Sequence, residues 1–105
     1  MKVTDILKDI PTPCFVVDLG LLRRNLAILD SVQQRTGAKI LLALKGFAMF
    51  GTFPLLKKTL HGVCASSPHE ARLGREEFGR EVHSFAAAYS EADLKELLTL
   101  SNHVV

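Results

Sequence analysis

One lysine, Lys45, stands out because of the residues that precede it. It ends the run KILLALK, in which every residue between Lys39 and Lys45 is apolar. An apolar mouth disfavours an ammonium relative to a neutral amine, and a neutral lysine is a nucleophile that forms a Schiff base with a carbonyl compound. The residues alone leave an alternative open, in which Lys45 ends a strand and extends its ammonium into water.

The elements around Lys45 alternate between strand and helix. Residues 39–45 show no polar alternation, which is typical of a strand covered on both faces in a parallel sheet. Leu22, Leu26, Leu29 and Val32 recur at helical spacing, and Gly37 ends that pattern. The remaining expectations are a strand at 14–17, a helix capped by Thr52 and running to Leu60, strands at 63–65 and 82–86, a helix from the capping box of Ser67 and Glu70 to Phe78, a helix from Ser90 to Leu100, and a strand beginning at His103.

This order predicts an α/β fold of βαβ units around a parallel sheet, since strands follow one another about every 20 residues. A (β/α)8 barrel and an open α/β sheet both fit. A complete barrel needs roughly 250 residues, so the 105 residues would form only the first part of one. In such barrels chemistry lies at the carboxyl ends of the strands, where Lys45 is expected.

Composition excludes several function classes. A net charge of +2, from 13 basic and 11 acidic residues spread along the chain, gives no basic patch for nucleic acid or an anionic membrane. Cys14 and Cys64 are far apart and form no CxxC motif, which favours reduced thiols. No segment resembles a signal peptide or a membrane span, so we expect a soluble, cytoplasmic protein.

Several stretches resemble a known family. TPCFVVD, KILLALKGFAMF, ASSPHEARLGREEFGREVHSFAAAY and LSNHVV together are similar to the N-terminal portion of the carboxynorspermidine (carboxyspermidine) decarboxylases. These enzymes belong to the alanine racemase/ornithine decarboxylase group, which uses pyridoxal 5'-phosphate. The similarity runs through essentially the whole chain in one register, and ARLGREEFG is its most specific part.

The resemblance implies a fold, a reaction and a set of partners. Residues 1–105 would be the N-terminal part of one pyridoxal-phosphate-binding (β/α)8 (TIM) barrel, and residues 1–18 would lead in with a strand that joins a C-terminal β-domain. Lys45 would carry the cofactor. The whole protein would be a cytoplasmic lyase that decarboxylates carboxynorspermidine or carboxyspermidine to norspermidine or spermidine in polyamine biosynthesis. It would be a homodimer, and this chain by itself would be inactive.

Two further side chains are candidates for the site. Ser66 follows the strand at 63–65 and is a candidate cofactor contact, although the family's ornithine decarboxylases carry an acidic residue near this point. Tyr89 follows the next strand and is a candidate substrate contact, with packing of its ring against the loop as the alternative. The four histidines show no spacing typical of metal ligands, so we expect no metal site.

Three alternatives remain open. The chain could belong to another pyridoxal-phosphate barrel: an amino-acid racemase, a diaminopimelate decarboxylase or a cofactor-homeostasis protein. It could be a lysine-dependent aldolase that needs no cofactor. It could also be a non-catalytic remnant that binds a partner through its open sheet edges.

Overall fold

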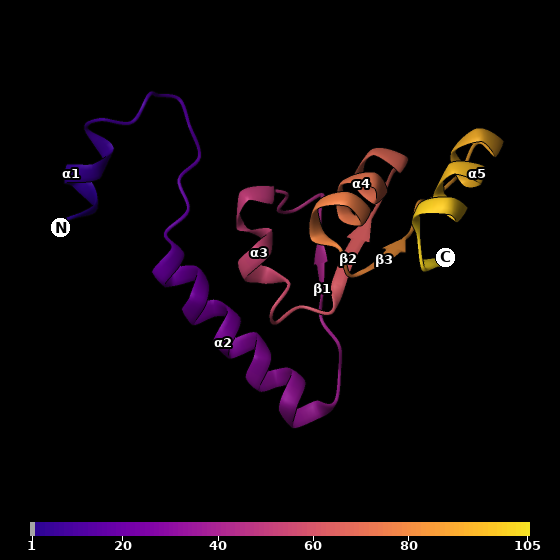
Figure 1. The fold of residues 1–105 in the computed structure, drawn as a ribbon, viewed down its shortest axis with the longest axis horizontal. Coiled ribbons are helices and arrows are strands. Elements are labelled where there is room, and N and C mark those ends of the chain that lie inside the picture. Colours follow the sequence, from indigo (N-terminus) through magenta and orange to yellow (C-terminus); the bar gives the residue numbers. More distant parts are fainter. Residues whose placement is uncertain (1) are drawn as a thin grey trace.

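A computed structural model describes residues 2–105 of the chain (Figure 1). A four-stranded sheet lies beside a set of helices, and α1 lies at the far end of the molecule from β4. The helices are α1 (Val3–Leu7), α2 (Leu19–Thr36), the 3-10 turn η1 (Phe50–Thr52), α3 (Phe53–Leu56), α4 (Pro68–Leu73), the π-helical turn η2 (Gly74–Phe78) and α5 (Glu91–Leu100). The strands are β1 (Leu41–Ala43), β2 (Gly62–Ala65), β3 (Glu81–Ser84) and β4 (His103–Val104).

All four strands are parallel and follow one another in chain order, β1-β2-β3-β4. One row of paired residues crosses the sheet from Ala43 through Cys64 and His83 to His103. A helix precedes each of β2, β3 and β4, as parallel neighbours require. The prediction of an α/β fold with a parallel sheet is therefore confirmed.

The sheet has one packed face and one open face. Val63, Ala65 and Val82 are fully buried against the helices, and Phe53 and Phe78 meet there edge to face with ring centroids 5.3 Å apart. Side chains of a strand alternate between faces, so Cys64 and His83 point away from this core. The core consists of Leu26, Leu44, Phe53, Leu56, Leu60, Val63, Ala65, Ala71, Phe78, Val82 and Leu97.

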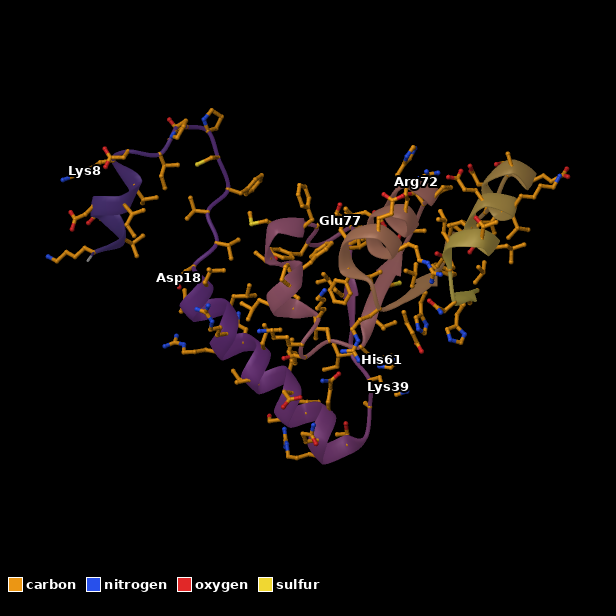
Figure 2. The ribbon with its side chains drawn as sticks, viewed as in Figure 1. Lys8, Asp18, Lys39, His61, Arg72 and Glu77 are labelled. Carbon is orange, nitrogen blue, oxygen red and sulfur yellow. The ribbon has the colours of Figure 1, made fainter. Side chains whose placement is uncertain are left out.

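Side-chain caps begin three of the helices. The Asp18 carboxylate accepts the amide of Leu21 at 3.0 Å and starts α2, where Figure 2 labels it. Ser67 caps α4 by accepting the amide of Glu70 at 3.2 Å, and Ser90 caps α5 in the same way. The Glu70 carboxylate turns back to the amide of Ser66 at 2.7 Å, so the predicted capping box closes one residue before the cap.

The C-terminal end of α2 is tied to the beginning of the sheet. Gly37 ends the helix in the left-handed region with a φ of 73°. The Gln33 side chain accepts the amide of Ile40 and donates to the carbonyl of Thr59, both at 2.9 Å. These bonds fix the chain that leads into β1, and with it the position of Lys45.

Local structure differs from expectation at three places. Residues 14–17 pair with no other segment within residues 2–105, and Phe15 is 95% exposed. The Thr52 hydroxyl caps no helix and instead donates to the carbonyl of Met49 at 2.7 Å, while the helix ends at Leu56. Ala43 of β1 is exposed rather than covered on both faces, because it lies in one row with Cys64 and His83 on the open face of the sheet.

No helix within residues 2–105 has the length and apolar character needed to cross a membrane.

Candidate functional site

Lys45 lies in the turn that follows β1, at the carboxyl edge of the sheet. The turn is closed by the amides of Gly46 and Phe47, which donate to the carbonyl of Ala43 at 3.0 and 3.2 Å. Leu44 is buried in the core, whereas Lys45 is exposed. Within residues 2–105 this side chain reaches solvent, and the apolar mouth expected around it stays a prediction for the whole protein.

Ser66 and Tyr89 lie at the same edge as Lys45. Ser66 follows β2 and Tyr89 lies in the loop after β3, and the carboxyl ends of parallel strands meet at one edge. The Ser66 amide donates to the Glu70 carboxylate, and the Ser66 hydroxyl takes no part in that bond. The structure thus brings the three predicted site residues to the ends of three consecutive strands.

Tyr89 is held in place through its hydroxyl. That oxygen accepts the amide of Ala86 at 2.9 Å and donates to the carbonyl of Val105 at 2.5 Å, and the ring packs against the core. Both bonds favour the packing role that the sequence left open. The substrate role of Tyr89 stays a prediction.

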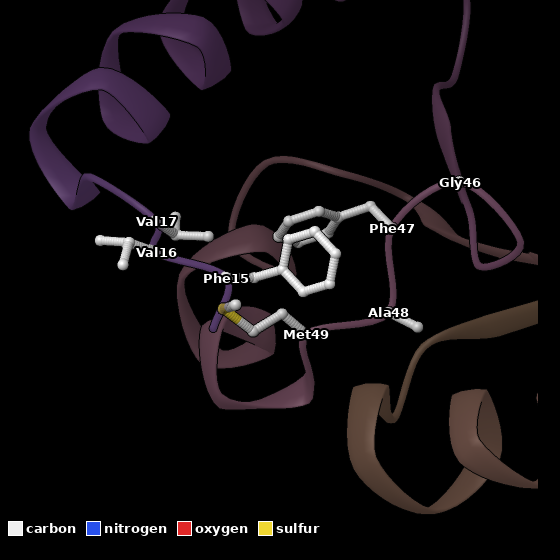
Figure 3. Close-up of a pocket in the computed structure, with 7 residues that line it drawn as sticks. All are labelled: Phe15, Val16, Val17, Gly46, Phe47, Ala48 and Met49. Carbon is white, nitrogen blue, oxygen red and sulfur yellow. The ribbon is translucent and has the colours of Figure 1, made fainter. Parts of the chain in front are cut away.

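An apolar pocket of about 430 Å³ adjoins the turn of Lys45. Figure 3 shows Phe15 reaching toward it from the segment before α2, and Phe47 and Met49 reaching toward it from the loop after Lys45. Val16, Val17, Gly46 and Ala48 complete its lining. The loop after β1 therefore lines an apolar pocket that begins at the residue following Lys45, and Lys45 itself is not part of the lining.

A second group of polar, metal-ligating side-chain types lies on the open face of the sheet. Glu81 and His83 are two residues apart on β3 and share one face of the sheet, and His103 on β4 pairs with His83. The Glu81 carboxylate accepts a hydrogen bond from His83 at 2.9 Å, and Nε2 of His61 lies 3.0 Å from the same carboxylate oxygen. Spacings of the HxxxH type, on which the expectation of no metal site rests, do not reveal a group that is assembled from two neighbouring strands. The signal was the E-x-H alternation of a strand followed by a histidine in the next strand.

Comparisons with known proteins point to one group of enzymes. No protein-family model matches the chain. It is 48% identical over 98 residues to a carboxyaminopropylagmatine decarboxylase of Synechocystis sp., an alignment that covers 93% of this chain and 25% of that protein. Two carboxynorspermidine/carboxyspermidine decarboxylases are also similar. That of Campylobacter jejuni is 38% identical over 93% of this chain and 26% of its own length, and that of Herminiimonas arsenicoxydans is 36% identical over 91% and 26%.

A solved structure agrees with these relatives. The crystal structure of carboxynorspermidine decarboxylase from Campylobacter jejuni, complexed with norspermidine, matches with a TM-score of 0.86 and 37% sequence identity. The match covers 90% of this chain and 26% of that one. The chain spans about a quarter of the length of the proteins that it matches. In sequence and in fold it is thus similar to the N-terminal part of the carboxynorspermidine/carboxyspermidine decarboxylases.

Proposed function

We propose that this chain supplies the cofactor-binding lysine, Lys45, of a pyridoxal-phosphate-dependent decarboxylase that acts on carboxylated polyamines. The observation that carries the proposal is the match to decarboxylases, in sequence over 93% of the chain and in fold over 90% of it, with Lys45 at the carboxyl end of β1. In (β/α) barrels that edge is where substrates react. The whole protein would be a carboxy-lyase of polyamine biosynthesis.

The residues present at this edge fit pyridoxal phosphate. Lys45 offers a primary amine, and within residues 2–105 no acidic side chain forms an ion pair with it. Phe47 and Met49 offer an apolar wall of the kind that a flat pyridine ring packs against. A primary amine together with apolar side chains therefore suits a cofactor that carries an aldehyde group on an aromatic ring.

The cofactor and the residues at this edge would have different roles in the reaction. Pyridoxal phosphate, when bound, supplies a ring that accepts the electron pair left behind as carbon dioxide departs. Lys45 would hold the cofactor through its Nζ atom, the amine that reacts with an aldehyde. Phe47 and Met49 would exclude water from one side. The Ser66 hydroxyl would contact the cofactor, and the Tyr89 ring would border the opening to the substrate.

The substrate class is a carboxylated polyamine. Two relatives bear the names of carboxynorspermidine and carboxyspermidine, and the solved structure holds norspermidine. A second candidate substrate is carboxyaminopropylagmatine, because the decarboxylase named after it is 48% identical to this chain while the other two are 36% and 38% identical. All of these substrates pair an amino acid with a long cationic tail.

The experiment measures release of carbon dioxide by the whole protein that carries this chain. Purified protein is offered carboxynorspermidine, carboxyspermidine and carboxyaminopropylagmatine in turn, with pyridoxal phosphate present. Lys45→Ala should lower turnover on the preferred substrate on the order of 10³-fold or more, because it removes the amine that holds the cofactor. Lys39→Ala, at an exposed lysine ahead of β1, should leave turnover unchanged.

Three outcomes contradict the proposal. Full turnover by Lys45→Ala would remove this lysine from the reaction. Racemisation of an amino acid without release of carbon dioxide would favour a racemase. Aldol cleavage that persists after the protein is freed of pyridoxal phosphate would favour a lysine-dependent aldolase.

In the whole protein we also propose a homodimer and a C-terminal β-domain joined by residues 14–17. The unpaired backbone of this segment and the 95% exposure of Phe15 support a partner strand elsewhere in the protein. Light scattering of the whole protein should give the mass of two subunits, and the mass of one subunit would contradict the dimer. The 105-residue chain by itself should release no carbon dioxide from any of the three substrates.

A further inference from the structure

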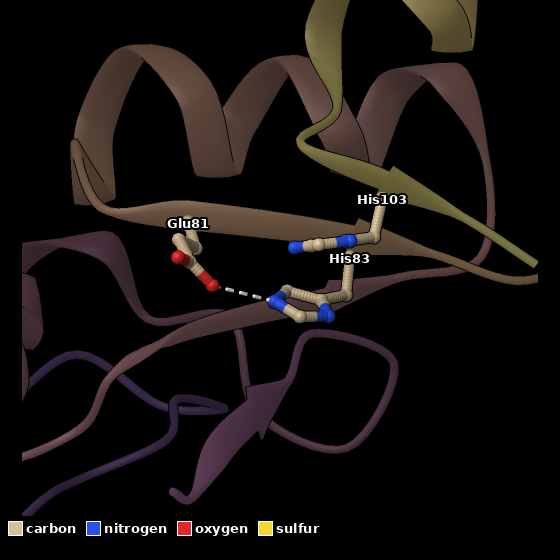
Figure 4. A group of neighbouring side chains, drawn as sticks. All are labelled: Glu81, His83 and His103. Carbon is tan, nitrogen blue, oxygen red and sulfur yellow. Dashed lines mark hydrogen bonds and ion pairs between the residues drawn. The ribbon is translucent and has the colours of Figure 1, made fainter.

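The open face of the sheet carries a compact group of metal-ligating side chains. Glu81 and His83 are two residues apart on β3 and therefore share a face, and His103 pairs with His83 from β4. Figure 4 shows the Glu81–His83 bond and the His103 ring lying against the His83 ring. The ring centroids are 4.4 Å apart and the planes are inclined by 33°. One donor atom from each side chain lies within 4.8 Å of the other two.

The chemistry of these donors suits a transition metal. Two imidazole nitrogens and one carboxylate oxygen are ligands that Zn²⁺, Ni²⁺ and Co²⁺ accept, with one position left for water. The Glu81 carboxylate lies 2.9 Å from a ring nitrogen of His83, so these two donors are close enough to share one ion.

A fourth side chain orients the carboxylate. His61 lies at the start of β2, where Figure 2 labels it, and its Nε2 is 3.0 Å from Oε2 of Glu81. Partners of this kind hold metal-binding carboxylates in position and strengthen binding. His61 would thus fix the carboxylate while His83 and His103 turn their nitrogens toward the ion.

We propose that Glu81, His83 and His103 bind a divalent transition-metal ion such as Zn²⁺. The site lies on the sheet face opposite the helices, which would face the interior of a complete barrel, whereas Lys45 lies in the turn at the carboxyl edge. The proposal concerns binding of an ion and does not depend on the decarboxylase reaction. A hydrogen-bonded group without affinity for metal is the alternative that the experiment excludes or establishes.

The test is titration of the whole protein with Zn²⁺ by calorimetry and with Co²⁺ by visible absorption, using protein without a histidine tag and stripped of metal by a chelator. We expect saturable binding of one ion per chain. His83→Ala and His103→Ala should each weaken binding at least about 10-fold, because each removes one ligand. His69→Ala is the matched control, since His69 is an exposed histidine on α4 outside the group, and it should bind as the wild type does.

Folding is monitored separately, so that loss of binding is not confused with loss of structure. Circular dichroism of each variant should match the wild type, and Glu81→Gln, which keeps the size of the side chain, should also weaken binding. The proposal is overturned if the wild type binds no ion saturably. It is equally overturned if His83→Ala and His103→Ala, correctly folded, bind as tightly as His69→Ala.

Discussion

The two faces of the sheet differ in what their side chains do. On the packed face Val63, Val82 and Ala65 are fully buried against the helices and carry no polar group. On the open face Ala43 and His103 are exposed, and the side chain of His83 keeps 29% of its surface in solvent. Neighbouring residues of one strand, such as Val82 and His83, therefore have opposite roles. The comparison teaches that the packed face stabilises the fold, while the open face and the carboxyl edge hold the polar side chains that we propose to bind a metal ion and the cofactor.

The largest loss of stability should come from Gly62→Ala, which would disrupt the pairing of β2 with β3. A Cβ atom at position 62 would lie 2.1 Å from the carbonyl oxygen of Glu81, and that backbone is held by pairing with β2. We expect a loss of more than about 4 kcal/mol in the free energy of unfolding, which sets this change among the most severe. Urea denaturation measures it. Gly51→Ala, where a Cβ meets nothing within 4 Å, is the control.

Removal of one aromatic ring from the packed face should come next. Phe78 is fully buried and packs edge to face with Phe53. Phe78→Ala should lower the free energy of unfolding by about 3–5 kcal/mol, because it leaves a cavity that the helices cannot fill. Glu77→Ala, at the exposed neighbouring position, should change it by less than about 0.5 kcal/mol. Similar losses in the two variants would show that η2 does not pack as described.

A matched pair on β3 compares the two faces directly. Val82→Ala should cost about 2 kcal/mol, since it removes buried apolar groups from the packed face. His83→Ala removes a partly exposed pair with Glu81 and should cost under about 1 kcal/mol. Thermal or urea unfolding of both variants measures the difference. An equal or larger loss for His83→Ala would contradict the assignment of the two faces.

The smallest effect concerns adjacent serines at the carboxyl edge. Ser67 caps α4, so Ser67→Ala should cost about 1 kcal/mol in stability. The Ser66 hydroxyl takes no part in that cap, so Ser66→Ala should leave stability within about 0.5 kcal/mol and weaken cofactor binding instead. Unfolding and cofactor titration, measured on both variants, separate the two roles. Weaker cofactor binding by Ser67→Ala alone would reverse them.

The sequence predicts the packed face well, because periodicity and caps are local signals. The helix ended by Gly37, the capping box of Ser67 and Glu70, and the helix begun by Ser90 all form as expected. The fully apolar run before Lys45 predicts a strand covered on both faces, but Ala43 lies on the open face and is exposed within residues 2–105.

The open face could be predicted less well, because its groups depend on register between strands. His83 and His103 are far apart in the sequence, and only the pairing of β3 with β4 brings their rings together. Tyr89 likewise could not be placed in advance, since its hydroxyl binds the end of β4 through Val105. The position of Lys45 at a strand end was predictable, because an apolar run that stops at a charged residue marks its own end.

The most direct test of the central claim is borohydride reduction of the whole protein in the presence of pyridoxal phosphate, followed by peptide mass mapping. Borohydride makes the lysine–cofactor bond permanent, so the labelled residue can be identified. The account predicts a phosphopyridoxyl group on Lys45 and none on Lys39, the nearest lysine before it. Label on other lysines with Lys45 unmodified would contradict the claim that this residue holds the cofactor.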